Sequence, residues 1–242
     1  TLPPLTGVRV NMARPGADDL FARLEAAPGR LASLKPWLGF APGRQEGLEG
    51  LGDLESSGLA SRQSAAVGDA LSRLGAGDWP GPVWDACSGR GGKTLALLEM
   101  GHERVLASDP SLKRLRAVSG EASRLGLRAP LVFRADAAHP PLRPTSGTIL
   151  LDAPCSGLGV LSRRPDAKWK RTLADVDTLA ALQRRIIDGC AQALTPGETL
   201  VYMTCTLTRA ENDQQAAHIE SLGFSRVALT EPVVASGLRE FF

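Results

Sequence analysis

Two cysteines and one carboxylate stand where apolar stretches of the sequence end. Asp152 and Cys155 belong to Asp-Ala-Pro-Cys-Ser-Gly at residues 152–157, and Cys205 belongs to Met-Thr-Cys-Thr at residues 203–206. If the two stretches are neighbouring parallel strands, all three side chains face one cleft at the carboxyl edge of the sheet. A thiolate adds readily to an electron-poor ring carbon, and even an ordinary cysteine is partly ionised near neutral pH. The pattern indicates nucleophilic chemistry and leaves open which cysteine attacks.

A glycine-rich turn, Ser-Gly-Arg-Gly-Gly-Lys-Thr at residues 88–94, follows a predicted strand and begins a predicted helix. Glycine lets the backbone approach a ligand closely, and the free N–H groups at a helix start attract electronegative groups. A P-loop would need glycine where Cys87 stands, and a dinucleotide fingerprint would need glycine or alanine where Thr94 stands. We therefore expect a nucleotide-like ligand of another class at this turn.

Two further carboxylates end predicted strands. Asp109 comes about 20 residues after the glycine-rich turn, where a carboxylate can accept hydrogen bonds from both ribose hydroxyls. Asp136 ends the next strand and can accept from an exocyclic adenine amine. Either one alone is more simply a cap or turn residue. Three consecutive strands with such endings favour a cofactor that carries ribose and adenine.

The four cysteines do not suit a metal site or a disulfide framework. No two have the C-x-x-C spacing, and only three histidines are available as further ligands. A disulfide framework is not expected in an α/β chain of this size without a secretory signal. Cys190 falls inside a predicted helix, where a cysteine usually acts as a small buried hydrophobe. We expect no metal.

The composition is that of a globular protein, with 43% apolar and 22% charged residues and a net charge of +2. No apolar run approaches the ~20 residues needed to cross a bilayer, and the first residues lack the features of a secretory signal. We therefore expect a cytoplasmic protein without a membrane partner, and favour a monomer. The weak positive charge is compatible with nucleic acid binding but does not require it.

The elements that must position these residues alternate between strand and helix. Strands are predicted at residues 83–87, 104–108, 131–135, 148–151 and 199–203, and helices after the glycine-rich turn up to residue 100 and at residues 111–125, 172–194 and 209–222. This alternation predicts βαβ units and a parallel sheet covered on both faces. We expect a Rossmann-like α/β domain over residues 61–242.

Residues 1–60 have a different character. A strand is predicted at residues 8–10 and a helix at residues 17–26, whereas residues 39–58 are rich in glycine and poor in large apolar side chains. So little apolar surface predicts a small accessory module without an independent core of any size. A helix over residues 59–74 is expected to link this module to the main sheet.

Together these segments resemble the Sun/Fmu-type RNA cytosine-5 methyltransferases, most closely the bacterial enzymes that act on small-subunit ribosomal RNA. The resemblance covers about residues 63–222. It rests on D-x-C-x-x-x-G-G-K-T at residues 85–94, D-A-P-C-S-G at 152–157, R-R-P-D-x-K-W at 163–169 and L-V-Y-x-T-C-T at 200–206, followed by Glu211 and Asn212. The sequence departs from the family at residues 88–90, where Ala-Ala-Pro is usual, and at residues 63–64, where Gln-Asp is usual.

The resemblance implies a class I methyltransferase fold, with a mostly parallel doubly wound sheet, and S-adenosylmethionine as the methyl donor. It implies that Cys205 attacks carbon 6 of a cytosine, that Cys155 assists product release and that Asp152 lies beside the base. Residues 1–60 resemble the small RNA-binding portion of the family. The implied cofactor site comprises Cys87, Ser88, Gly89, Arg90, Gly91, Gly92, Lys93, Asp109, Asp136 and Asp152.

A group of cations follows the Cys155 segment. It consists of Arg163, Arg164, Lys168, Lys170 and Arg171. Beside an active site such a group can hold phosphates, so we expect these residues to bind RNA. Trp169 lies among them and is expected to pack into the domain.

Two alternatives stand beside an RNA methyltransferase that forms 5-methylcytosine. A DNA cytosine-5 methyltransferase would use Cys155, in the Pro-Cys pair, as its nucleophile, whereas the Thr204–Cys205 strand end favours RNA. An inactive RNA-binding scaffold would not need both cysteines and Lys93. Ribosomal RNA is the expected partner, with transfer RNA as an alternative.

Overall fold

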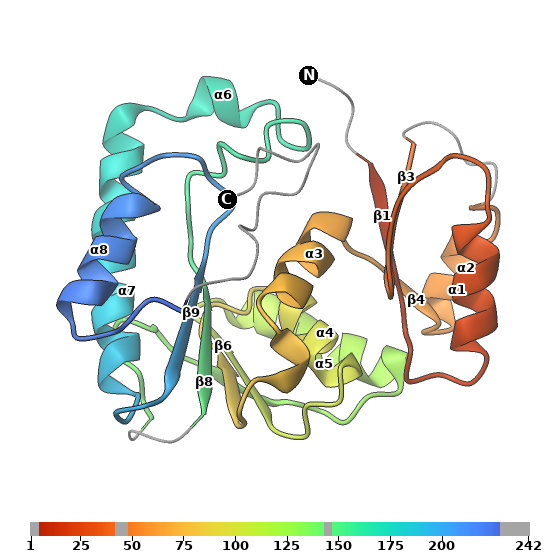
Figure 1. Cartoon of the computed structure of the whole chain (residues 1–242), viewed down its shortest axis with the longest axis horizontal. Helices are drawn as coiled ribbons and strands as arrows, with labels where there is room; N and C mark the ends of the chain where they lie inside the picture. Colours follow the sequence, from red (N-terminus) through yellow and green to blue (C-terminus); the bar gives the residue numbers. More distant parts are fainter. Residues whose placement is uncertain (1–4, 42–47, 143–146, 228–242) are drawn as a thin grey trace.

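Two β-sheets organise the computed structural model, which describes residues 5–41, 48–142 and 147–227. The larger sheet has five strands in the order β7-β6-β5-β8-β9, and the smaller has four in the order β2-β3-β1-β4. Figure 1 shows the larger sheet with helices on both of its sides and the smaller sheet at the right, next to α1 and α2. Each sheet packs around its own cluster of buried apolar side chains.

Every neighbouring pair of strands in the larger sheet is parallel. The strands are β5 (Val83–Asp85), β6 (Val105–Asp109), β7 (Leu131–Arg134), β8 (Thr148–Asp152) and β9 (Thr199–Met203). The helices are α3 (Ala65–Arg73), α4 (Gly92–Glu99), α5 (Leu112–Leu125), α6 (Ala167–Lys170), α7 (Leu173–Gln192) and α8 (Asp213–Ser221). The predicted Rossmann-like α/β fold is confirmed, because each apolar run forms a strand of this sheet.

Alternate residues of the central strands bury the two faces of the larger sheet. Val83, Leu150 and Val201 pack on the side of α3 and α4. Trp84 and Leu151 pack on the other side, with side chains of α7 that include Cys190. Burial on both faces explains why the central strands are continuously apolar. Cys190 is fully buried, as predicted for a structural cysteine.

The smaller sheet is antiparallel, and the sequence did not indicate its pairing of β1 with both β3 and β4. It contains β1 (Thr6–Val10), β2 (Arg30–Leu34), β3 (Trp37–Phe40) and β4 (Ala60–Arg62), with α1 (Ala17–Glu25) and α2 (Leu51–Ser56) beside it. The helix expected over residues 59–74 is confirmed only for residues 65–73, because residues 60–62 form β4, which pairs with β1. The α3 helix begins only after Ser64, whose hydroxyl accepts a hydrogen bond from the Ala66 N–H at 3.2 Å.

This N-terminal unit has more of a core than its composition suggested. Val8, Phe21, Leu38 and Phe40 belong to a separate buried apolar cluster that α1 and α2 help to form. The expectation that too little is apolar here was therefore wrong. Short strands and helices achieve burial because each turns its few large side chains towards the same centre.

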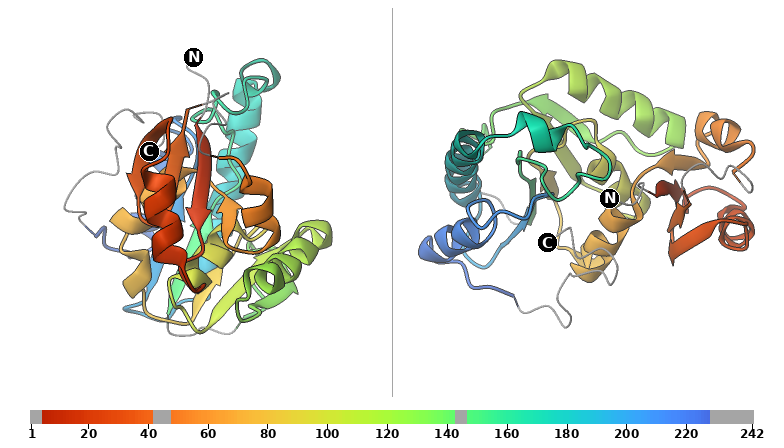
Figure 2. Two further views of the ribbon diagram at one scale, coloured as in Figure 1. Left: turned by 90° about the vertical axis from the view of Figure 1, so that its right-hand side faces the viewer. Right: turned by 90° about the horizontal axis from the view of Figure 1, so that it is seen from above.

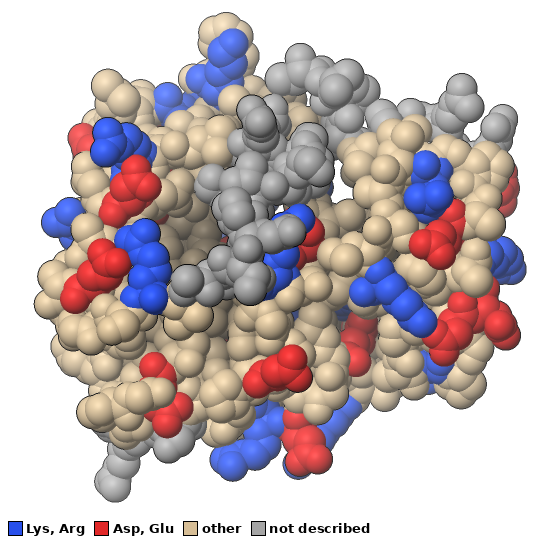
Figure 3. Space-filling model, viewed as in Figure 1, with Lys and Arg blue, Asp and Glu red and all other residues tan. Residues whose placement is uncertain are grey.

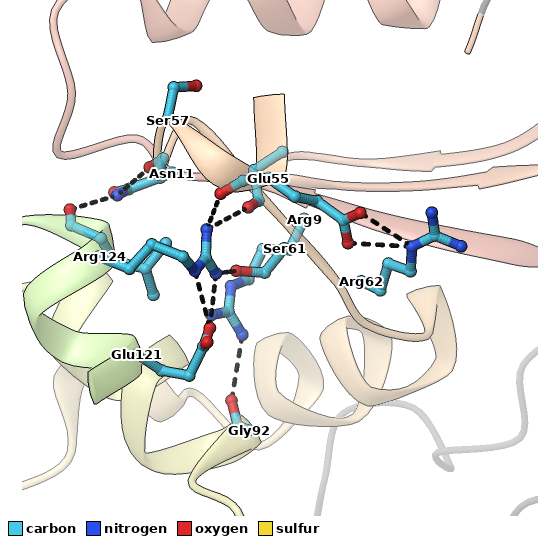
Figure 4. A network of polar contacts seen from close by, with 12 residues as sticks. Arg9, Asn11, Glu55, Ser57, Ser61, Arg62, Gly92, Glu121 and Arg124 are labelled. Carbon is cyan, nitrogen blue, oxygen red and sulfur yellow. Dashed lines mark hydrogen bonds and ion pairs between the residues drawn. The ribbon is translucent and has the colours of Figure 1, made fainter. Parts of the chain in front are cut away.

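Polar contacts attach the smaller sheet to α5 (Figure 4). The Asn11 side chain donates to the Leu125 carbonyl at 2.8 Å and to the Gly58 carbonyl at 3.0 Å. Arg124 of α5 donates to the Ser61 hydroxyl at 3.1 Å and also contacts the Glu55 carbonyl. The right-hand view of Figure 2, seen from above, shows the smaller sheet and its helices beside the end of α5. These hydrogen bonds satisfy main-chain carbonyl groups that would otherwise lack a partner at the junction between the two parts.

Candidate active site

The ends of β8 and β9 bring the predicted nucleophiles together. The two strands are parallel neighbours, with Asp152 opposite Met203. The Cys155 and Cys205 sulfur atoms lie 3.2 Å apart, and the Cys205 N–H donates to the Cys155 sulfur at 3.3 Å. The two strands are thus adjacent, as predicted for neighbouring parallel strands that end at one cleft.

The contact between the two thiols makes them chemically unequal. The hydrogen bond from Cys155 lowers the pKa of Cys205 to about 7, although burial and Asp152 act in the opposite direction. Lys93 and Arg164 lower the pKa further. The same hydrogen bond, together with burial, raises the pKa of Cys155. The lowered pKa of Cys205 favours its thiolate form, and Cys155 can donate a hydrogen bond to that thiolate.

Lys93 and Asp152 form an ion pair at the floor of the same site. Lys93 is the second residue of α4 and Asp152 is the last residue of β8. Burial lowers the pKa of Lys93, but Asp152 more than offsets this, so the pKa is raised and the ammonium form is favoured. The pair can hold a proton beside any ring that enters the site.

A cavity of about 250 Å³ joins the Cys205 thiol to this ion pair. Its lining also includes Ser64 at the start of α3, together with Arg163 and Arg164, and the Arg163 guanidinium donates to the Ser64 hydroxyl. The sequence did not predict Ser64 as a site residue, because it lies far along the chain from the cysteines. The one sequence signal for it was weak: it differs from the residue that is usual in the family at this position.

The glycine-rich turn has the conformation that its glycines were expected to provide. Gly91 has φ 85°, and a Cβ there would lie 2.9 Å from the Val118 side chain, so no other residue fits without movement. Gly89 donates its N–H to Asp109 at 3.2 Å. Arg90 is exposed. Burial raises the pKa of Cys87, so its thiol stays protonated and does not act as a nucleophile.

The two predicted cofactor carboxylates lie at the same sheet edge and also make turns. Asp109 accepts from the Ser111 N–H at 2.7 Å, and Asp136 accepts from the Ala138 N–H at 3.0 Å. Each therefore performs the simple turn role that was considered for it. The roles are compatible, because a carboxylate has further lone pairs to offer a ligand. Asp136 is exposed, whereas Asp109 is buried.

Asp85 is a site residue that the sequence reasoning quoted only as part of a motif. It ends β5 beneath the glycine-rich turn, and burial raises its pKa to about 6. Thr94 donates to one carboxyl oxygen at 2.7 Å, while the other is buried without a hydrogen-bond partner. An unsatisfied buried oxygen at this edge suits a donor from a bound ligand.

Two of the five cations, Arg163 and Arg164, line the cavity, whereas Trp169 does not pack into the domain. Trp169 is 83% exposed, and Lys168 lies over its ring at 5.3 Å. That prediction is wrong because α6 is a single turn without buried residues. Figures 1 and 3 show α6 at the top of the molecule, where blue side chains gather. Arg171 ties this segment to the Cys155 loop by donating to the Ser156 carbonyl at 3.3 Å.

The described residues contain no group of three or more potential metal ligands, and none of their helices is both long and apolar enough to cross a membrane.

Comparisons with known proteins converge on one family. The family model for the 16S rRNA methyltransferases RsmB/F matches residues 76–225. Ribosomal RNA small subunit methyltransferase B of Vibrio cholerae is 40% identical over 184 residues, which cover 73% of this chain and 42% of that protein. The protein of the same name from Shewanella oneidensis is 43% identical over 137 residues, covering 55% of this chain and 32% of that protein. The chain spans less than half the length of these relatives.

Solved structures show the same fold. The crystal structure of NSun6 from Pyrococcus horikoshii with SFG has a TM-score of 0.78 at 21% identity, and it covers 95% of this chain and 83% of that chain. A methyltransferase homolog protein from the same organism has a TM-score of 0.69 at 27% identity, with 88% and 68% covered. Because 95% of this chain is covered, the similarity to the NSun6 structure includes most of the N-terminal unit as well as the larger sheet.

Proposed function

Because the chain belongs to the RsmB/F family of 16S rRNA methyltransferases, we propose that it methylates carbon 5 of a cytosine in ribosomal RNA, with S-adenosylmethionine as donor. The observation that carries the proposal is the cavity in which the Cys205 thiol faces the Lys93–Asp152 ion pair. A nucleophile on one side and a proton-bearing pair on the other suit addition to a pyrimidine ring.

The cofactor is proposed to bind along the carboxyl edge formed by β5, β6 and β7. The residues present fit a ligand with ribose, adenine and an amino group. Gly89 in the turn has open space where a Cβ would lie, Asp109 and Asp136 offer carboxylates, and Asp85 has an unsatisfied buried oxygen. The remaining residues of the proposed site are Cys87 to Lys93 and Asp152. When bound, S-adenosylmethionine supplies an electrophilic methyl group.

The cytosine must leave its helix before its ring can enter the cavity, at a cost of a few kcal/mol unless it is already unpaired. The Cys205 thiolate then adds to carbon 6, and negative charge develops on carbon 5 and towards N3. A proton held by Lys93 and Asp152 can stabilise that charge at N3. A bare Asp152 carboxylate would repel the charge, so its pairing with Lys93 supports this role.

Release of the product requires that the bond between the Cys205 sulfur and carbon 6 breaks again. After carbon 5 has gained the methyl group, a base from solvent takes the carbon 5 proton. The electron pair of that C–H bond forms the 5,6 double bond, and the Cys205–carbon 6 bond breaks so that Cys205 leaves as a thiolate. Cys155, at 3.2 Å, can stabilise the leaving thiolate by a hydrogen bond. The raised pKa of Cys155 keeps it protonated for this purpose and makes it a poor nucleophile. This supports Cys205 over the DNA-type alternative, in which Cys155 attacks.

RNA is proposed to approach over the exposed cations Arg163, Arg164, Lys168, Lys170 and Arg171. Two of them line the cavity and a third is bonded to the Cys155 loop, so the group borders the reacting atoms. We propose residues 1–60 as the small RNA-binding portion and residues 61–242 as the catalytic domain. The polar contacts between the smaller sheet and α5 support a fixed placement of the two parts.

One denaturing gel tests the assignment of the two cysteines. Labelled RNA and cofactor are incubated with Cys205→Ser, Cys155→Ser and the buried-thiol control Cys190→Ala. Cys205→Ser should form no covalent adduct, because a hydroxyl is almost never ionised near neutral pH. Cys155→Ser should accumulate an adduct that resists denaturation, since release is slowed. Cys190→Ala should behave as the unmodified protein, and an adduct that persists in Cys205→Ser would refute the mechanism.

A further inference from the structure

A carboxylate that the proposed chemistry does not use lies fully buried behind the two cysteines. Glu211 precedes α8 and its side chain is 0% exposed. No ion pair involves this side chain within the described part of the chain. Burying an unpaired carboxylate is costly unless hydrogen bonds replace the water it loses. Its hydrogen-bond partners therefore show what it stabilises.

Five donors converge on the two oxygens of Glu211. One oxygen accepts from the Ser156 N–H at 2.8 Å and from the Gln183 amide at 3.1 Å. The other accepts from the hydroxyls of Ser156 at 2.6 Å, Thr208 at 2.8 Å and Thr206 at 3.2 Å. Burial raises the pKa of Glu211, but these hydrogen bonds outweigh burial and lower it overall, so the carboxylate is ionised.

Two of these donors are the direct chain neighbours of the cysteines. Ser156 follows Cys155 and Thr206 follows Cys205, and their hydroxyls are also 2.7 Å apart. The loops after β8 and β9 are thus joined through Glu211 one residue beyond each thiol. Gln183 extends the connection by donating to the Pro154 carbonyl at 2.9 Å, on the other side of Cys155.

We propose that Glu211 is a positioning residue that holds the Cys155 and Cys205 loops together and keeps their thiols in hydrogen-bond contact. It acts through Ser156 and Thr206 and does not line the cavity. The catalytic meaning of this role rests on the proposed function, whereas the geometric role does not. Contact with Cys155 is the main cause that lowers the pKa of Cys205, so losing Glu211 should weaken that effect.

Three variants separate this role from general stability. Glu211→Ala removes the acceptor. Glu211→Gln keeps the shape, and its amide can donate to hydroxyls that turn to accept while its carbonyl still receives the Ser156 N–H. Gln215→Ala is the matched control, because Gln215 is equally buried on α8 but donates only to main-chain carbonyls of Ala180 and Ala210.

Two measurements on the free chain report on the thiols without RNA or cofactor. The first is the pH dependence of Cys205 alkylation by iodoacetamide, followed on the Cys205 peptide by mass spectrometry. The second is the equilibrium of the Cys155–Cys205 disulfide in glutathione buffers, which gives the effective concentration of one thiol at the other. An inactive chain would still give both values, so failure of the proposed function would not be mistaken for failure of this proposal.

In Glu211→Ala the alkylation midpoint should rise from about 7 towards the ordinary value of 9.0, and the effective concentration should fall by about tenfold or more. Glu211→Gln should retain both values, and Gln215→Ala should retain both while lowering the unfolding temperature. If Glu211→Ala does not fold, Thr208→Val removes one of the five bonds and should shift both values in the same direction by less. Unchanged values in a folded Glu211→Ala, or an equal shift in Gln215→Ala, would overturn the proposal.

Discussion

Arg9 and Glu99 form a buried ion pair between the smaller sheet and the helix that follows the glycine-rich turn. The Arg9 and Glu99 side chains are 2% and 4% exposed. Their two hydrogen bonds measure 2.8 Å and 3.0 Å, and Arg9 also donates to the Gly92 carbonyl at 3.0 Å. Arg9 therefore holds the first residue and the last residue of α4. Because Lys93 follows Gly92, this contact also anchors the start of the proposed cofactor site.

Replacing Arg9 by methionine should destabilise the protein strongly. The aliphatic part of the side chain is kept, but Glu99 is left buried without its partner, which typically costs about 3–5 kcal/mol. For a chain of this length that corresponds to a fall in Tm of roughly 6–20 °C. The double variant Arg9→Met, Glu99→Leu should recover most of the loss, since it buries no charge.

The loss of folding stability in Arg9→Met should also depend on pH, and its direction follows from Glu99. Burial raises the pKa of Glu99, and Arg9 opposes that rise. Without Arg9 the folded-state pKa should rise further above the unfolded value. A raised folded pKa favours the folded state at low pH, and this contribution is lost as the pH rises through the folded pKa. The destabilisation by Arg9→Met should therefore be smaller at pH 5 than at pH 8.

Urea unfolding of the unmodified protein, both single variants and the double variant, at pH 5 and pH 8, measures these differences. A loss below about 1 kcal/mol for Arg9→Met, within the range of exposed ion pairs, would refute the buried-pair reasoning. So would a double variant that is no more stable than Arg9→Met, or a loss that is the same at both pH values.

Three further outcomes are expected. Asp109→Asn keeps the hydrogen bond from the Ser111 N–H but removes the negative charge. Calorimetry should therefore show that S-adenosylmethionine binds about tenfold more weakly, or weaker still. Unchanged affinity would show that Asp109 is not part of the cofactor site. Neutralising Arg164, Lys168 and Lys170 should flatten the salt dependence of RNA binding, by roughly 0.7–0.9 in the log–log slope for each lost phosphate contact; an equally steep slope would show that these cations do not meet RNA. Trp169→Ala should cost about 1–3 kcal/mol of RNA binding if the exposed ring stacks on a base, with Trp169→Phe retaining most of it. Fluorescence anisotropy measures the effect, and equal affinities would leave Trp169 without a role in binding.

The chemistry-bearing residues could be located from sequence because strand ends follow a simple rule. Parallel strands are buried on both faces, so their apolar runs are visible, and their carboxyl ends share one edge. The sequence pattern therefore predicts that Cys155, Cys205 and Asp152 lie at one cleft. The family motifs then predict Cys205 as the nucleophile and Cys155 as the assisting thiol, a choice that spacing alone leaves open.

The errors have a common origin in contacts between distant segments. A three-residue strand such as β4 is too short to show a period, and it forms only because β1 offers an unpaired edge. Trp169 looked like a core residue by type, but the single turn of α6 has no surface to bury it against. The local pattern of apolar residues predicts neither the β4 strand nor the exposure of Trp169.

The sequence by itself determined the alternation of strands and helices, the edge at which the site forms and the residue types gathered there, because these depend on local periodicity and on motifs. Only the tertiary structure decided which groups meet: the thiol contact that makes Cys205 the more acidic cysteine, the Glu211 network behind it and the pair of Arg9 with Glu99, 90 positions apart. Burial and hydrogen-bond partners set the charge of these groups, and both are properties of chain segments brought together by folding.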